Sequence, residues 1–145
     1  MSQYFDLGER TLWNPSNGAA RLFLGQVSAF ETELGLASGI GPMRNDESQI
    51  DPAALKMFVD ALLERHLRTD HAIVIALSES FLATMLVLAE RADVRLGRPT
   101  GDAAAFGRNK DIQVPSAGSA TMTNAYARLY QLRGAARQLS RFMPR

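Results

Sequence analysis

One acidic residue lies inside the most apolar stretch of the sequence and is the first candidate for chemistry. Glu79 stands between two serines in the segment from His71 to Ala92, HAIVIALSESFLATMLVLAERA. Apolar residues occupy every side of a helix drawn through this segment, so we expect other helices to enclose it. Because burial disfavours the charged form of a carboxylate, an enclosed Glu79 that faces a pocket would suit a general acid or base.

Glu79 has two alternative environments besides a pocket. An ion pair with Arg21, Arg128 or Arg133 would neutralise it, because burying an unpaired carboxylate costs several kcal/mol. In the other alternative the side chain simply reaches solvent. The surroundings of Glu79 in the folded chain decide between these interpretations.

A catalytic Glu79 would act on a small, largely apolar molecule held between helices, where helical bundles commonly have their pockets. Tyrosines would donate hydrogen bonds to this molecule, and methionines make adaptable pocket walls. The candidate catalytic residues are Glu79, Tyr126 and Tyr130. The candidate ligand-binding residues are Trp13, Ser78, Ser80, Met85 and Met122. The alternative is that the tryptophan, tyrosines and methionines belong to the core.

The two histidines, His66 and His71, flank a turn that also contains Asp70. Two histidines and a carboxylate can form an open metal site. A spacing of five residues across a helix break differs, however, from the i, i+4 pair of a zinc-binding helix. We therefore expect no metal and no other cofactor, and we interpret His66 as a residue that caps or packs at a helix end.

Charge is distributed unevenly along the chain. The segment from Met1 to Glu90 has 6 Lys/Arg against 12 Asp/Glu, whereas Arg91 to Arg145 has 10 against 3. Arg133, Arg137 and Arg141 recur every four residues near the C-terminus. Such a stripe is a solvated face, a contact with the acidic part of the chain, or a surface for an acidic protein partner or a phosphate-bearing ligand.

Nucleic-acid and membrane binding are not indicated. The sequence pI near 8.2 is below the strongly basic range of nucleic-acid-binding domains. A membrane span from Ala72 to Ala89 would place Glu79 near the bilayer centre, where an ionised side chain costs roughly 2.5–3.5 kcal/mol. The first residues show no basic region followed by an apolar run, and the chain has no cysteine. We expect a soluble, cytoplasmic protein.

The fold predicted from these patterns is a single, mainly α domain over residues 1–145. It is a compact bundle of about four helices with a short N-terminal β-hairpin and a long irregular loop before the last helix. Aromatic and β-branched residues around Gly8 predict the hairpin between Gln3 and Trp13. Residues 36–50 are predicted to form a loop. The helices are expected at about residues 16–34, 52–67, 71–92 and 119–142.

The first two helices have clear boundary residues. Ser16 or Asn14 would cap the first helix at its N-terminus, and Gly35 would end it in the left-handed conformation. Asp51 followed by Pro52 is typical of a helix start, since proline is favoured at the first helical position.

The third helix follows closely on the second. The link from Arg68 to Asp70 is so short that the two helices must be antiparallel neighbours, with Asp70 or Thr69 capping the third. The longest stretch without a helical pattern runs from Asp93 to Ala117, and its residues Asp111 to Val114 alternate enough to form a short strand beside the hairpin.

Three motifs carry a resemblance to a known family. They are Tyr4-Phe5-Asp6, the run TLWNPS from Thr11 to Ser16, and GIGPM from Gly39 to Met43. Together they resemble small actinobacterial proteins grouped as a domain of unknown function, over most of the chain. That family has no established activity, so the resemblance implies no functional residues.

Two functional hypotheses follow. In the first, the bundle binds a small apolar molecule, and Glu79 carries out an acid/base step without a cofactor. In the second, the chain is a non-catalytic interaction module, such as an inhibitor, an immunity or regulatory partner, or a homodimer. This module would use the stripe Arg133, Arg137 and Arg141 or the segment from Asp93 to Ala117, and its interface would exceed about 1,000 Å². We favour the first hypothesis because of Glu79.

Overall fold

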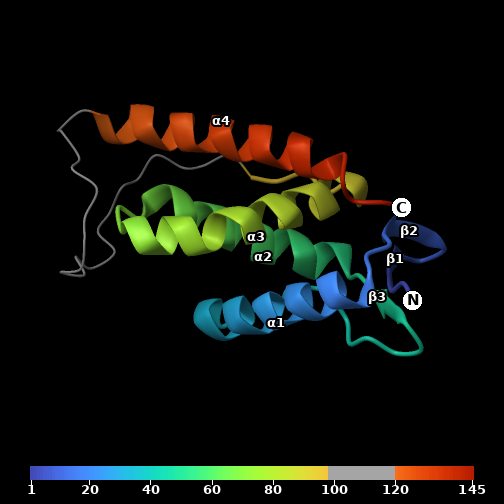
Figure 1. Ribbon diagram of the computed structural model, residues 1–145. Helices are drawn as coiled ribbons and strands as arrows, with labels where there is room; N and C mark the ends of the chain where they lie inside the picture. The colour runs from blue at the N-terminus through green and yellow to red at the C-terminus, as the bar shows by residue number, and fades with distance from the viewer. Residues whose placement is uncertain (98–119) are drawn as a thin grey trace.

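A computed structural model describes residues 1–97 and 120–145, with side chains in the last helix described from residue 124 onward. It confirms a mainly α fold with four long helices and an N-terminal hairpin. The elements are β1 (Tyr4–Leu7), β2 (Arg10–Trp13), α1 (Asn17–Leu34), β3 (Glu47–Gln49), α2 (Pro52–Arg68), α3 (Ala72–Arg91) and α4 (Ala120–Ser140). Figure 1 shows α2 and α3 lying between α1 and α4, with the small sheet and both termini at one end.

The predicted boundaries of α1 and α2 are confirmed. Ser16 caps α1 by accepting a hydrogen bond from the backbone N–H of Ala19 at 3.4 Å, and Gly35 ends the helix with a φ of 63°. At the start of α2, Asp51 accepts hydrogen bonds from two backbone N–H groups, and Pro52 occupies the first helical position.

The predicted cap of α3 is wrong. The Nδ1 atom of His71 accepts a hydrogen bond from the backbone N–H of Val74 at 3.3 Å, so His71 is the N-cap. Thr69 is instead the residue that ends α2, and its hydroxyl accepts from the N–H of His71 at 3.2 Å. Thr69 is thus the C-cap of α2, and His71, two residues later, is the N-cap of α3.

The hairpin belongs to a sheet of three strands in the order β2-β1-β3, where β1 is antiparallel to β2 and parallel to β3. The loop predicted for residues 36–50 therefore contains a strand that the sequence pattern did not indicate. Only Ser48 of this three-residue strand is buried, so no apolar alternation marks it. The strand predicted at Asp111 to Val114 lies outside the described residues.

Two glycines let the chain pass close to other backbone segments, Gly39 to the start of α2 and Gly41 to β3. Gly39 has a φ of 79°, and a Cβ atom there would lie 2.5 Å from the carbonyl oxygen of Asp51 and 2.5 Å from the backbone nitrogen of Leu55. A Cβ on Gly41 would lie 2.7 Å from the carbonyl oxygen of Gln49. The motif GIGPM is thus explained by close backbone packing.

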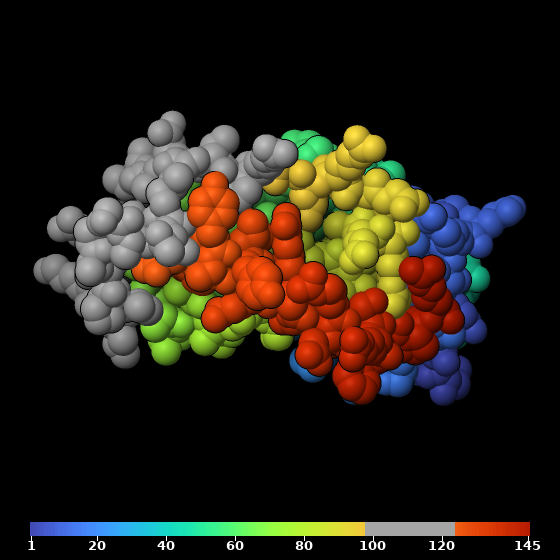
Figure 2. Space-filling model, turned by 90° about the horizontal axis from the view of Figure 1, so that it is seen from above, coloured from blue at the N-terminus to red at the C-terminus, as the bar shows by residue number. Residues whose placement is uncertain are grey.

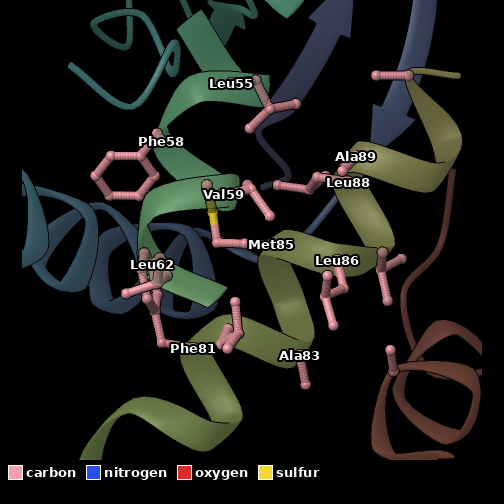
Figure 3. Packing of buried hydrophobic residues seen from close by; sticks show 14 of the residues in the cluster. Leu55, Phe58, Val59, Leu62, Phe81, Ala83, Met85, Leu86, Leu88 and Ala89 are labelled. Carbon is pink, nitrogen blue, oxygen red and sulfur yellow. The ribbon is translucent and has the colours of Figure 1, made fainter. Parts of the chain in front are cut away.

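The core lies mainly between α2 and α3 (Figure 3). Met85 of α3 is fully buried beside Val59 and Leu62 of α2, as the close view shows. Aromatic rings extend this core to α1 and the sheet. The ring of Phe81 stacks on Phe30 with 4.6 Å between centroids, and Trp13 meets Phe23 edge-on at 5.2 Å.

The helix α3 is enclosed over only half of its length. Its buried residues are concentrated between Phe81 and Ala89, whereas Ile73, Ala76, Leu77 and Ser80 are exposed. Complete enclosure was therefore predicted wrongly for its N-terminal half. Within the described residues it is the one helix long and apolar enough to cross a membrane, and half of its most apolar window is buried by the rest of the fold.

Candidate functional site

Glu79 is not the buried carboxylate that the sequence predicted. Its side chain is half-buried, and within the described residues it forms no ion pair or side-chain hydrogen bond. The reason is its place on α3, directly before the exposed Ser80 and on the half of the helix that its neighbours leave open.

Arg128, one of the partners considered for Glu79, binds a helix end instead. Its guanidinium donates hydrogen bonds to the backbone carbonyls of His66 at 3.1 Å, Leu67 at 3.2 Å and Thr69 at 2.6 Å. These are carbonyls at the C-terminus of α2, where a cation is favoured. Arg128 therefore holds α4 against the end of α2.

A small cavity lies between α1, α2 and α3. Its volume is about 170 Å³, and its wall is mostly apolar. Arg65 of α2 forms an ion pair with Glu33 of α1, with 2.5 Å between nitrogen and oxygen, and both residues line the cavity. The lining residues are Phe30, Glu33, Leu62, Arg65, His66, Val74, Leu77 and Ser78. Glu79 does not line this cavity.

Two buried polar residues in the cavity wall form a hydrogen-bonded pair. His66 is 2% exposed and Ser78 is 3% exposed, and Nδ1 of His66 lies 2.9 Å from Oγ of Ser78. The hydroxyl of Ser78 also lies 2.7 Å from the carbonyl oxygen of Val74, to which only the hydroxyl can donate. A serine hydroxyl has one hydrogen, so Ser78 accepts from His66 and Nδ1 carries the proton. No described residue forms a hydrogen bond with the other ring nitrogen, Nε2, which then carries a lone pair.

The environment of His66 keeps its ring neutral. Burial, and secondarily the positive charge of Arg128, lower the pKa of His66 from 6.5 to about 4. At neutral pH the ring is therefore an imidazole with one donor and one acceptor. Such a weakly basic group is a poor proton acceptor for catalysis, but a good partner for a ligand O–H or N–H group.

The other predicted site residues do not meet at this cavity. Among the predicted ligand-binding residues whose side chains are described, only Ser78 lines it. Trp13 and Met85 belong to the core, and Ser80 is exposed. Tyr126 and Tyr130 are 61% and 73% exposed on α4. The remaining residue, Met122, has no described side chain.

Sequence reasoning missed His66 as part of a site. The sequence alone indicates that His66 caps or packs at a helix end. It is buried there as expected. The missing information was the position of Ser78, which only the packing of α3 on α2 brings within hydrogen-bond distance.

The two histidines do not converge on a common point. Nδ1 of His71 caps α3, whereas Nδ1 of His66 binds Ser78. In residues 1–97 and 120–145, no group of three or more histidine, aspartate or glutamate side chains is arranged to hold a metal ion.

The arginine stripe lies on the outer side of α4. Arg133, Arg137 and Arg141 are exposed, and none of them forms an ion pair within the described part of the chain. Figure 2, which looks down on α4, shows this helix lying across the surface of the molecule. The stripe is therefore exposed, and it does not contact the acidic part of the chain.

Comparisons with known proteins give a family and no activity. No curated protein and no solved structure matches the chain significantly. A family model described as a family of unknown function (DUF6086) matches residues 1–145, which is the whole of the sequence. The chain therefore belongs to this family of unknown function, DUF6086.

Proposed function

We propose that the cavity between α1, α2 and α3 binds a small, largely apolar molecule that carries one hydrogen-bond donor. The observation that supports this proposal is the buried pair of His66 and Ser78 in an otherwise mostly apolar wall. Ser78 fixes the ring by accepting from Nδ1, so Nε2 is the nitrogen available to accept from a ligand. Ligand pockets commonly combine an apolar lining with a few polar groups of this kind.

The volume limits the ligand to a small one. An apolar cavity of about 150 Å³ holds benzene, and the present cavity is about 170 Å³. A single aromatic or aliphatic ring with a hydroxyl group fits this volume. Glu33 and Leu77 are the exposed residues of the wall, and Leu77 is the apolar one. We therefore expect Leu77 to control the entry of an apolar molecule.

The proposal concerns binding and not an acid/base step. Glu79 lies outside the cavity wall, and the weak basicity of His66 suits an acceptor better than a base. We place this binding function in the cytoplasm, with which a chain that has no cysteine is compatible.

Titration of isotope-labelled protein with phenol, followed by amide NMR shifts, tests the proposal. We expect saturable shifts at residues around the cavity, led by Leu77 and Ser78. The variant Leu77→Trp, which places a larger ring at the opening, should weaken phenol binding at least fivefold. Ile73→Trp is the matched control, because Ile73 is an exposed apolar residue one turn away that does not line the cavity.

Phenol shifts that stay linear up to the solubility limit, or that are the same in Leu77→Trp and in the wild type, would show that this cavity is not a ligand site.

A further inference from the structure

Four residues of α4 and Arg141, in the turn directly after it, form one continuous exposed face, which we call the tyrosine–arginine face. They are Tyr126, Tyr130, Arg133, Arg137 and Arg141. Their spacings of four, three, four and four residues place them on one side of a helix. At 1.5 Å per residue, the helical part of the face from Tyr126 to Arg137 is about 16 Å long. All five side chains are exposed, including both aromatic rings.

The opposite side of α4 is firmly attached to the fold. Leu129, Leu132 and Ala136 are buried against the rest of the bundle. Arg128 binds the end of α2, and Arg91 of α3 donates hydrogen bonds to the backbone carbonyls of Ser140 and Met143. The tyrosine–arginine face thus lies on a helix that these contacts hold to the fold between Arg128 and Met143, and Figure 2 shows this helix on the surface of the molecule.

The positive charge of this face is not compensated by any ion pair with a described residue. Residues 120–145 contain five arginines and no aspartate or glutamate. Elsewhere in the described chain, arginines such as Arg10 and Arg65 pair with acids. The three arginines of the face, in contrast, form no ion pair with any described residue.

We propose that the tyrosine–arginine face binds an acidic helical segment of a partner protein. Arginines four residues apart lie about 6 Å apart along the axis, which matches carboxylates repeated every four residues on a second helix. Tyr126 and Tyr130 add apolar contact area at the N-terminal end of the face. Tyrosine and arginine are among the residues most enriched at the energetic centres of protein interfaces.

The charge of the rest of the chain favours a protein over a larger polyanion. The formal net charge is only +1, because residues 1–90 carry 12 acidic side chains against 6 basic ones. A nucleic acid or an anionic bilayer would be repelled by this acidic part, whereas a short acidic helix meets only the arginines. A second copy of α4 carries no aspartate or glutamate that could pair with these arginines, so it is not the occupant that we propose.

This interaction is independent of the small-molecule cavity, since no residue of α4 lines that cavity. The test uses a fluorescent synthetic helical peptide with glutamates at every fourth position, flanked by leucines, and a scrambled peptide of the same composition. Binding to the full chain is measured by fluorescence anisotropy at low and moderate salt. We expect the patterned peptide to bind at least fivefold more tightly than the scrambled one and to weaken with salt.

Charge reversal then locates the binding face. The variant Arg133→Glu, Arg137→Glu, Arg141→Glu should weaken binding of the patterned peptide at least tenfold, with its far-ultraviolet circular dichroism and melting temperature showing that it still folds. The matched control reverses three exposed arginines elsewhere, and so has the same net charge: Arg21→Glu, Arg44→Glu and Arg95→Glu. This control should bind within threefold of the wild type.

Three results would overturn the proposal. The first is equal binding of the patterned and scrambled peptides. The second is equal loss of binding in the two triple variants, which would show an effect of net charge alone. The third is tighter binding of a 20-nucleotide single-stranded DNA, or of phosphatidylglycerol vesicles, than of the patterned peptide.

Discussion

The Nδ1 atom of His66 lies 2.9 Å from Oγ of Ser78, and both residues are buried in the wall of the cavity between α1, α2 and α3. The residues are 12 positions apart in the sequence, and the antiparallel packing of α2 on α3 brings them together. Because Ser78 donates to the carbonyl of Val74, the direction of the hydrogen bond from His66 is fixed.

The stability of the protein should fall between about pH 6.5 and pH 4 because of His66. The pKa of His66 is 6.5 in the unfolded chain and is lowered to about 4 in the folded chain. Between these two pH values the unfolded chain therefore binds a proton at His66 and the folded chain does not. The contribution lost is about 3 kcal/mol in the free energy of unfolding, since one pKa unit corresponds to about 1.4 kcal/mol. Urea unfolding at a series of pH values measures it.

The variant His66→Phe isolates this contribution, because it removes the titrating group while keeping a planar ring. The difference in unfolding free energy between wild type and variant should decrease by about 3 kcal/mol from pH 7 to pH 4. A difference that is constant with pH would mean that His66 titrates alike in the folded and unfolded chains.

Ser78→Ala should destabilise the fold by about 1–3 kcal/mol, because the buried N–H of His66 would lose its acceptor. The matched control is Ser80→Ala on the same helix, which alters an exposed hydroxyl and should change stability by less than about 0.5 kcal/mol. Chemical unfolding at pH 7 compares the two variants. Equal effects would contradict the assigned hydrogen bond.

Arg128→Met should cost about 2–4 kcal/mol, because three carbonyls at the end of α2 lose a charged donor. The pKa of His66 should also rise, since Arg128 contributes to lowering it. Arg133→Met on the exposed side of the same helix should change stability by less than about 0.5 kcal/mol. Thermal unfolding and NMR titration of the histidine ring provide the two measurements. A stability change in Arg128→Met no larger than that in Arg133→Met would refute its capping role.

Gly39→Ala should destabilise the protein by more than about 2 kcal/mol, because its φ is 79° and the added Cβ would meet the backbone of α2 at 2.5 Å. At Gly25, in contrast, a Cβ atom would meet no other atom, because this glycine lies inside α1 with open space around it. Gly25→Ala should stabilise by about 0.5–1 kcal/mol through helix propensity. Denaturant midpoints of the two variants should therefore move in opposite directions.

The parts of the fold that depend on local chemistry could be predicted from the sequence. Ser16, Gly35 and Asp51 mark the ends of α1 and the start of α2 through side-chain capping and a left-handed backbone, and these effects act within a few residues. The face of α2 from Leu55 to His66 is buried as its periodicity indicates.

The parts that depend on tertiary packing could not be predicted. The burial of Glu79 was predicted from the apolar character of α3, but burial requires neighbours on every side, and the described neighbours cover only the half of the helix around Phe81 to Ala89. The strand β3 has no apolar alternation because only Ser48 faces inward. The pairing of His66 with Ser78 depends on how α3 lies against α2, which periodicity does not specify.

The most direct test of the account is a long-range proton–nitrogen NMR spectrum of the His66 ring at pH 7, with and without phenol. We predict a neutral ring with the proton on Nδ1, an unprotonated Nε2, and a saturable change in the Nε2 shift as phenol is added. A ring protonated on Nε2, or an Nε2 shift that phenol leaves unchanged, would contradict the assignment of this nitrogen as the ligand acceptor.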